Sequence, residues 1–163
     1  MKNKIIIFGN SASGKSTLAK KLCSKFKLSH LDLDTLAWQN TKPLERESLN
    51  VSRKKIIEFV ESQKEWVIEG CYSDLIEVAI PHSSEIIFMN LSNEVCINNA
   101  RKRPWEPHKY DSKQKQDENL EMLVSWISQY NTRADVFSKA AHEKLYENYF
   151  GKKRVITNNM QDF

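Results

Sequence analysis

Apolar residues occur along this chain in short unbroken runs, and longer stretches with helical spacing separate these runs. The first run, Ile5-Ile6-Ile7-Phe8, has no polar interruption, which is typical of a central strand in a parallel sheet. The expected strands lie at about residues 3–9, 29–33, 65–69, 85–91 and 153–157.

Between these strands, apolar residues recur at intervals of three and four, which predicts amphipathic helices. The helices are expected at about residues 14–27, 44–64, 73–79, 92–102, 116–130 and 134–149. The stretch from the second strand to Pro43 is expected to be a loop. Strands that alternate with helices predict an α/β fold, in which a parallel sheet lies between helical layers.

A phosphate-binding loop joins the first strand to the first helix. Residues 9–17 read G-N-S-A-S-G-K-S-T, a complete G-x-x-x-x-G-K-[ST] motif (Walker A) in the strand–loop–helix context that it requires. Lys15 is expected to reach the β- and γ-phosphates, and the Ser16 hydroxyl to bind Mg²⁺. The expected nucleotide-binding residues are Gly9, Asn10, Ser11, Ala12, Ser13, Gly14, Lys15, Ser16 and Thr17.

Several classes of phosphate-loop protein are disfavoured by what is missing. The D-x-x-G and N-K-x-D strings of GTPases do not occur, and four glycines leave no room for the signature of a transport ATPase. An oligomeric mechanical ATPase normally has a longer chain and an apolar strand that ends in paired acids. The small phosphotransferases remain.

Composition adds modest limits. With 163 residues the chain is expected to form one domain, 1–163, and a net charge of +4 suits anionic substrates but is too small to argue for nucleic acid. Three widely spaced cysteines form no metal or redox pattern, so a reducing, cytoplasmic setting is expected. The first apolar run is too short for a signal peptide, and no run approaches the length of a membrane span. The chain is expected to be a monomer or a homodimer.

Further segments carry a family resemblance. They are H-L-D-L-D-T-L-A-W at 30–38, W-V-I-E-G-C-Y at 66–72, Arg101 and Arg103, and the segment 126–133. With the phosphate loop, they make the chain resemble the adenylate-kinase and shikimate-kinase-like group of small P-loop kinases. Within that group it most resembles the adenylate-kinase-like ATPases related to a DNA-topology-modulation protein. The resemblance implies a P-loop NTPase three-layer α/β/α sandwich, a five-stranded parallel sheet of order 2-3-1-4-5, an acceptor-binding arm at about 35–64 and a lid at about 101–116.

Acidic residues follow two of the strands. Asp32 and Asp34 end the second strand, where ligands of parallel sheets bind, so they could hold hydrated Mg²⁺ or take a proton from a hydroxyl. Similar kinases use a D-x-D here, which implies Asp34 as a catalytic residue and Asp32 as a metal residue. Glu69 matches the aspartate of the adenylate-kinase D-G pair, which implies a water-mediated Mg²⁺ contact. The alternatives are that Asp34 caps a helix or turn, and that Glu69 is a solvated acid.

Basic residues are dense in the expected lid, R-K-R-P-W-E-P-H-K at 101–109. Arginine forks stabilise the charge that phosphoryl transfer spreads over oxygens, so Arg101, Arg103 and Arg133 are candidate catalytic residues. Arg101 could instead stack on adenine, and the whole segment could be a solvated basic turn. Trp38, Tyr72 and Trp105 either pack on a planar acceptor or form the core of the arm.

The sequence therefore predicts a kinase that uses ATP and Mg²⁺ and moves the γ-phosphate to a small-molecule acceptor, either a hydroxyl or a nucleotide. The arginine that follows the D-G pair of nucleoside monophosphate kinases is missing here, although Arg46 and Arg53 of the arm could substitute. The alternative is a nucleotide-binding regulator or nucleic-acid-associated ATPase. No membrane partner is expected, and no nucleic-acid-binding module is visible.

Overall fold

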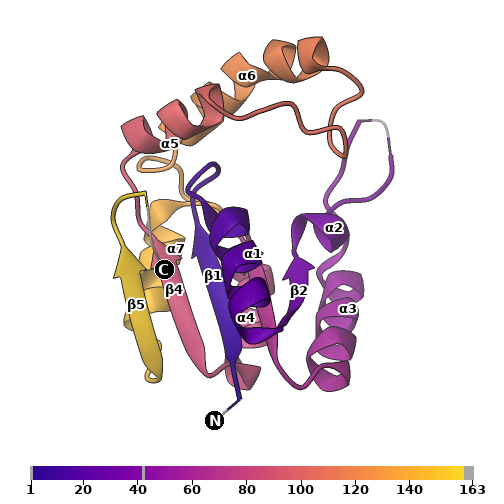
Figure 1. Ribbon diagram of the computed structural model, residues 1–163, viewed down its shortest axis with the longest axis vertical. Coiled ribbons are helices and arrows are strands. Elements are labelled where there is room, and N and C mark those ends of the chain that lie inside the picture. The colour runs from indigo at the N-terminus through magenta and orange to yellow at the C-terminus, as the bar shows by residue number, and fades with distance from the viewer. Residues whose placement is uncertain (1, 42, 160–163) are drawn as a thin grey trace.

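A parallel sheet forms the centre of the molecule. The computed structural model describes residues 2–41 and 43–159, so Lys42 of the expected arm and residues 160–163 of the expected domain lie outside the described residues. The described strands are β1 (Lys4–Gly9), β2 (Ser29–Asp32), β3 (Trp66–Gly70), β4 (Glu85–Met89) and β5 (Lys152–Ile156). Their order is β2-β3-β1-β4-β5 with every pair parallel, which confirms the order implied by the resemblance (Figure 1).

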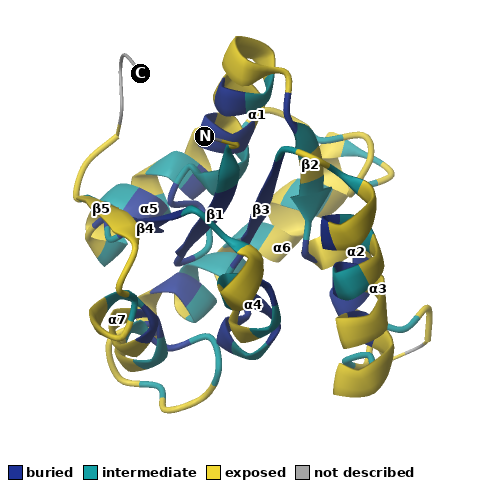
Figure 2. Ribbon diagram, turned by 90° about the horizontal axis from the view of Figure 1, so that it is seen from below, coloured by how far each residue is buried: buried dark blue, intermediate teal, exposed yellow. Residues whose placement is uncertain are grey.

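The helices cover both faces of this sheet. They are α1 (Lys15–Phe26), α2 (Asp34–Ala37), α3 (Leu49–Ser62), α4 (Ser73–Ala79), α5 (Asn93–Arg101), α6 (Lys113–Ser128) and α7 (Lys139–Glu147), and a 3-10 turn, Ile80–His82, follows α4. One apolar cluster joins the sheet to α2, α3, α4 and α7, and a second joins the opposite face to α1, α5 and α6. The three-layer α/β/α prediction is therefore confirmed (Figure 2).

The burial of each strand follows from its position in the sheet. All residues of β3 and β4 are buried, and so are those of β1 after Lys4, because these strands occupy the middle of the sheet. The residues of β5 are mostly exposed, since it is an edge strand. Parallel strands bring their carboxyl ends to one edge, which is where ligands of such sheets bind.

The structure corrects three expected elements. The loop after the second strand contains the four-residue helix α2. The helix expected at 44–64 starts only at Leu49, because residues 38–41 and 43–46 form the two sides of a hairpin, in which the backbones of Trp38 and Arg46 pair in an antiparallel bridge. The helix expected at 134–149 starts at Lys139, where the Ser138 hydroxyl accepts a hydrogen bond from the Ala141 amide and caps the helix.

The expected lid and the tip of the expected arm both lie beyond the carboxyl edge of the sheet. In Figure 1 the segment between α5 and α6 runs above the strand ends toward the hairpin that residues 38–41 and 43–46 form. Burial raises the pKa of Asp32, and the charge of Lys109 in this segment partly offsets that effect. Within the described residues, no helix has the length and apolar character needed to span a membrane.

Candidate phosphate-binding and acceptor site

The phosphate loop has the backbone that its glycines predict. Gly9 and Gly14 have φ values of +155° and +91°, and a Cβ atom on Gly9 would lie 2.4 Å from the Met89 carbonyl oxygen of β4. Only glycine allows this close approach of the loop to the neighbouring strand. The loop therefore depends on Gly9 for its contact with β4 and on Gly14 for its turn into α1.

Polar groups of the loop are arranged to receive an anion. Helix α1 begins at Lys15 without a side-chain cap and without an acid in its first turn, so its positive end is free of a competing carboxylate. The Ser13 hydroxyl is buried without a hydrogen-bond partner, and Lys15 Nζ donates to the Asn10 carbonyl at 2.6 Å. An uncapped helix end, an unpartnered hydroxyl and a lysine folded over the loop fit the phosphates of a nucleotide.

Asn10 connects the phosphate loop to helix α6. Its side chain is buried, the Ser11 amide donates to Asn10 Oδ1 at 2.8 Å, and Asn10 Nδ2 donates to the Ile127 carbonyl of α6 at 3.3 Å. The structure thus gives Asn10 an anchoring role in the loop.

The three acids expected at the strand ends lie together. Asp32 and Glu69 are register partners in β2 and β3, and the charges of Glu69 and Asp34 both act on Asp32. Burial raises the pKa of Asp32, and the two neighbouring carboxylates raise it further.

Glu69 is also joined to the phosphate loop. It is 3% exposed, and burial alone would raise its pKa, but hydrogen bonds from His30 and Ser16 and the charge of Lys15 outweigh burial and lower it. Two of the three residues expected at the Mg²⁺ site, Ser16 and Glu69, are therefore neighbours.

These donors suit magnesium rather than an all-protein metal cage. Among the residues that the structure describes, no group of three or more His, Cys, Asp or Glu side chains is placed to hold a metal ion. Magnesium at phosphate-transfer sites commonly takes one or two carboxylates and completes its octahedron with phosphate oxygens and water. Ser16, Asp32 and Glu69 supply a donor set of that kind.

Asp34 opens α2, and its carboxylate points toward Tyr72 in the segment between β3 and α4. Its Oδ1 accepts a hydrogen bond from the Tyr72 hydroxyl, which in turn accepts one from Trp38 Nε1 at 2.9 Å. The Asp34 amide donates to Asp32 Oδ1 at 2.9 Å, whereas the N-cap position of α2 is Leu33, so Asp34 does not cap this helix. Two residues for which the sequence left a core role or an acceptor role open, Trp38 and Tyr72, thus both join the Asp34 site.

Arg46 is the arm arginine that enters this site. Its guanidinium lies 5.0 Å from the Tyr72 ring centre and 5.5 Å from that of Phe137, and it pairs with Asp74 at 3.2 Å. Arg53, in contrast, lies exposed on α3. The structure therefore favours Arg46 of the two candidates.

The three candidate catalytic arginines each pair with a carboxylate. Arg101 Nη1 lies 3.0 Å from Glu121 of α6, and Arg103 Nη1 lies 3.4 Å from Glu106 within the lid. Arg133 is placed differently. Its guanidinium lies 3.4 Å from the centre of the Trp126 ring and makes a two-pronged contact with Asp135, at 2.9 Å from Nε and 2.7 Å from Nη2.

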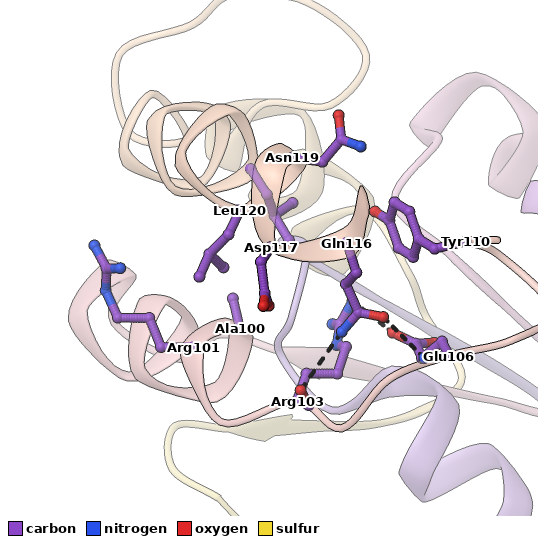
Figure 3. A pocket seen from close by; sticks show the side chains of 10 residues that line it. Ala100, Arg101, Arg103, Glu106, Tyr110, Gln116, Asp117, Asn119 and Leu120 are labelled. Atoms are coloured by element: carbon purple, nitrogen blue, oxygen red, sulfur yellow. Dashed lines mark hydrogen bonds and ion pairs between the residues drawn. The ribbon is translucent and has the colours of Figure 1, made fainter. Parts of the chain in front are cut away.

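The side-chain amide of Gln116, in the first turns of α6, binds the backbone of lid residues 103–106. Gln116 Oε1 accepts from the Glu106 amide at 2.8 Å, and its Nε2 donates to the Pro104 carbonyl at 3.0 Å and to the Arg103 carbonyl at 3.5 Å. Figure 3 shows the contacts of Gln116 with Arg103 and Glu106 at the edge of a pocket between α5, the lid and α6. Trp105 of the lid is exposed, and its indole N–H donates to the Tyr110 carbonyl at 3.1 Å, so it belongs to the lid rather than to the core of the arm.

A pocket beside the phosphate loop contains residues that sequence reasoning missed. Asn99 and Asn159 exchange amide hydrogen bonds of 2.9 and 3.0 Å, and Asn99 Nδ2 also donates to the Ala12 carbonyl at 3.0 Å. Thr17 and Lys21 line the same pocket. No motif marks the two asparagines, because they come from α5 and from the segment after β5 and meet only through the fold.

Comparison with known proteins agrees with this geometry. The chain matches the AAA domain family (AAA_18) over residues 5–123. It is 25% identical over 149 residues to the uncharacterized protein YqaC of Bacillus subtilis (strain 168), an alignment that covers 88% of this chain and 82% of the relative.

Two solved structures have a similar fold. A shikimate kinase from Bacteroides thetaiotaomicron superposes with a TM-score of 0.55 at 16% identity, covering 98% of this chain and 89% of that one. A sugar kinase from Janibacter sp. HTCC2649 superposes with a TM-score of 0.55 at 10% identity, covering 96% and 86%. These likenesses show the fold of the small P-loop kinases.

Proposed function

The chain belongs to the AAA domain family and has the fold of the small P-loop kinases, and from this premise we propose that it is an ATP- and Mg²⁺-dependent phosphotransferase with a small-molecule acceptor. One observation carries the proposal: the phosphate loop and the acids Asp32, Asp34 and Glu69 share one edge of the sheet. A phosphate donor and a proton-accepting carboxylate are the two parts that transfer to a hydroxyl needs.

In this proposal the triphosphate of ATP lies along the loop of residues 9–17. Lys15 would leave the Asn10 carbonyl and contact the β- and γ-phosphates, and the buried Ser13 hydroxyl would gain a partner. The nucleoside end would occupy the pocket that Asn99 and Asn159 line, since this pocket continues from the loop at Gly14 and Thr17.

Ser16, Asp32 and Glu69 are the residues that would hold Mg²⁺, directly or through water. The ion would neutralise charge on the phosphates when bound. Glu69 is suited to this role because its pKa is lowered, so it remains a carboxylate at neutral pH.

The acceptor would lie between the arm, residues 35–64, and the strand-end acids. We favour a hydroxyl acceptor over a nucleotide, because Asp34 is exposed at this position and can take a proton. The acceptor oxygen attacks the γ-phosphorus, its proton passes to Asp34, and the bond to the bridging oxygen breaks to release ADP.

The lid, residues 101–116, would close over these reactants and exclude water. Arg101 and Arg103 would exchange their carboxylate partners for phosphoryl oxygens, which arginine forks bind well. Arg133 would act from the side of Trp126 and Phe137, beside the acceptor region. In this proposal residues 1–163 act as one cytoplasmic domain, as a monomer or a homodimer.

Release of ADP in the presence of Mg-ATP and a panel of nucleosides, nucleotides, sugars and hydroxy acids tests the proposal. One hydroxyl acceptor should stimulate release, and Lys15→Ala should lower that release by about a hundredfold or more while the protein stays folded. Asp34→Asn should reduce transfer to a small residual rate and leave ATP affinity unchanged.

Three results would contradict this function. They are turnover by Lys15→Ala at the wild-type rate, a loss of ATP affinity in Asp34→Asn, and ADP release that requires nucleic acid rather than a small acceptor. The second would move Asp34 to the metal side of the site, and the third would favour a nucleic-acid-associated ATPase.

A further inference from the structure

A chain of hydrogen bonds connects the arm to the proposed base. Trp38 Nε1 donates to the Tyr72 hydroxyl, and this hydroxyl donates to Asp34 Oδ1. The three residues come from the hairpin of the arm, the segment after β3 and the first turn of α2. The hydroxyl of Tyr72 therefore connects Trp38 of the arm to Asp34.

Tyr72 is held in place on several sides. It is 3% exposed, its ring packs against Phe137 with 5.3 Å between ring centres, and the neighbouring Ser73 amide donates to the Val136 carbonyl at 3.0 Å. On the other side, the imidazole of the buried His142 contacts the Cys71 carbonyl at 2.8 Å. Because Tyr72 is fixed by packing and Asp34 is exposed, the hydrogen bond orients the carboxylate rather than the tyrosine.

The two oxygens of the Asp34 carboxylate then have separate tasks. Oδ1 accepts from Tyr72, which leaves Oδ2 available for the proton of an acceptor hydroxyl. Burial raises the pKa of Tyr72, and so do the neighbouring Cys71 and Asp34, so the phenol remains a donor at neutral pH.

We infer that Tyr72 is a positioning residue for phosphoryl transfer, which orients the Asp34 carboxylate and makes that orientation depend on the arm through Trp38. The inference rests on the proposed function, in which Asp34 accepts the proton. Arg46 strengthens the connection between the arm and Tyr72. Its backbone pairs with that of Trp38 in the hairpin, and its guanidinium lies 5.0 Å from the centre of the Tyr72 ring. An acceptor that moves the hairpin would therefore act on the same hydrogen bonds that aim the base.

Three substitutions measure the contribution of this chain to turnover. Tyr72→Phe removes the hydroxyl and keeps the ring, Trp38→Phe removes the indole N–H, and Tyr149→Phe is the matched control, because the Tyr149 hydroxyl bonds to Ser83 at 2.9 Å outside the site. Tyr72→Phe should lower kcat by about 10- to 100-fold with the KM for ATP unchanged, since a hydrogen bond to a charged group is lost. Trp38→Phe should lower kcat by about threefold to fivefold, as expected for a neutral hydrogen bond, and Tyr149→Phe should not change it.

A double variant separates positioning from general damage to the fold. If Tyr72 acts through Asp34, Tyr72→Phe should cause no further loss in residual turnover when Asp34 is already Asn. A further tenfold loss in that background, or wild-type kcat in Tyr72→Phe alone while Asp34→Asn keeps only its residual turnover, would overturn the inference and leave the proposed function intact.

A measurement without an acceptor keeps the two proposals distinguishable. The Tyr72 hydroxyl proton should give a slowly exchanging downfield proton resonance, which is lost in Tyr72→Phe and shifted upfield in Asp34→Asn. If no acceptor supports ADP release, the proposed function fails, and the inference about positioning fails with it even when this resonance is present. If an acceptor is found but the resonance is unchanged in Asp34→Asn, only the inference is overturned.

Discussion

His30 Nε2 lies 3.3 Å from Glu69 Oε2, and the two residues belong to the neighbouring strands β2 and β3. Glu69 is buried, whereas His30 reaches the surface, so the histidine stands between the buried carboxylate and solvent. With Ser16 and Lys15 on its other side, Glu69 stays ionised in a position where burial alone would favour the neutral acid. A buried, ionised carboxylate beside a phosphate loop attracts a divalent cation.

Replacing this charge should weaken the response to magnesium. Glu69→Gln keeps the shape of the side chain but removes the charge, and we expect the Mg²⁺ concentration for half-maximal ADP release to rise by about 10-fold or more. Glu65→Gln is the control, because Glu65 accepts hydrogen bonds from Asn3 at the opposite end of the sheet. An unchanged magnesium titration in Glu69→Gln would remove Glu69 from the metal site.

Stability should fall in mild acid because of His142. This residue is fully buried, and burial lowers the pKa of its imidazole from 6.5 to about 4. The unfolded chain therefore binds the proton more readily, so the stabilisation is complete above pH 6.5 and is lost as the pH falls toward 4. The loss should reach about 3 kcal/mol in the free energy of unfolding.

Urea denaturation at a series of pH values measures this loss. His142→Gln retains an N–H donor but cannot be protonated in this range, so its stability should change less between pH 7 and pH 4 than that of the wild type. A variant with the same pH dependence as the wild type would assign the effect to other groups.

The two glycines of the phosphate loop should differ in their tolerance of alanine. At Gly9 the new Cβ meets the Met89 carbonyl oxygen at 2.4 Å, whereas at Gly14 the nearest atom is the flexible Met89 Cε at 3.7 Å. Gly9→Ala should therefore lower the free energy of unfolding by about 3 kcal/mol, and Gly14→Ala by about 1 kcal/mol from its positive φ alone. Denaturant unfolding of both variants provides the comparison, and equal losses would contradict the proposed clash.

Gln116 should control how firmly the lid is held. Its amide contacts three backbone groups of residues 103–106, and Gln116→Ala removes them all. We expect cleavage by trypsin within 101–109 to be severalfold faster, and ATP hydrolysis without an acceptor to rise, because an open lid admits water. Gln114→Ala is the control, since Gln114 lies on the same helix and its Nε2 donates to the exposed Glu118 at 3.3 Å rather than to the lid backbone. Equal cleavage rates in the two variants would show that Gln116 does not hold the lid.

Some features of the site could be predicted because they are local. The nine residues of the phosphate loop are contiguous, and the flanking strand and helix follow from the apolar pattern on either side. The start of α7 is also marked in the sequence, since Ser138 is a typical N-cap residue. The apolar spacing continues past this residue to 134, so spacing alone predicts a helix that is too long. Helix α2 was missed because four residues are too few to show a helical period.

The strand–helix alternation, the phosphate loop and the acids that follow the strands can be predicted from the amino-acid sequence, because each depends on residues adjacent in the chain. The pairing of distant side chains depends on the fold: Tyr72 meets Asp34, Asn99 meets Asn159, and Arg133 meets Trp126. These partners are chosen by the order in which strands pair and by how two apolar layers pack on the sheet. That choice is made by contacts summed over the whole core, and no short stretch of sequence contains it.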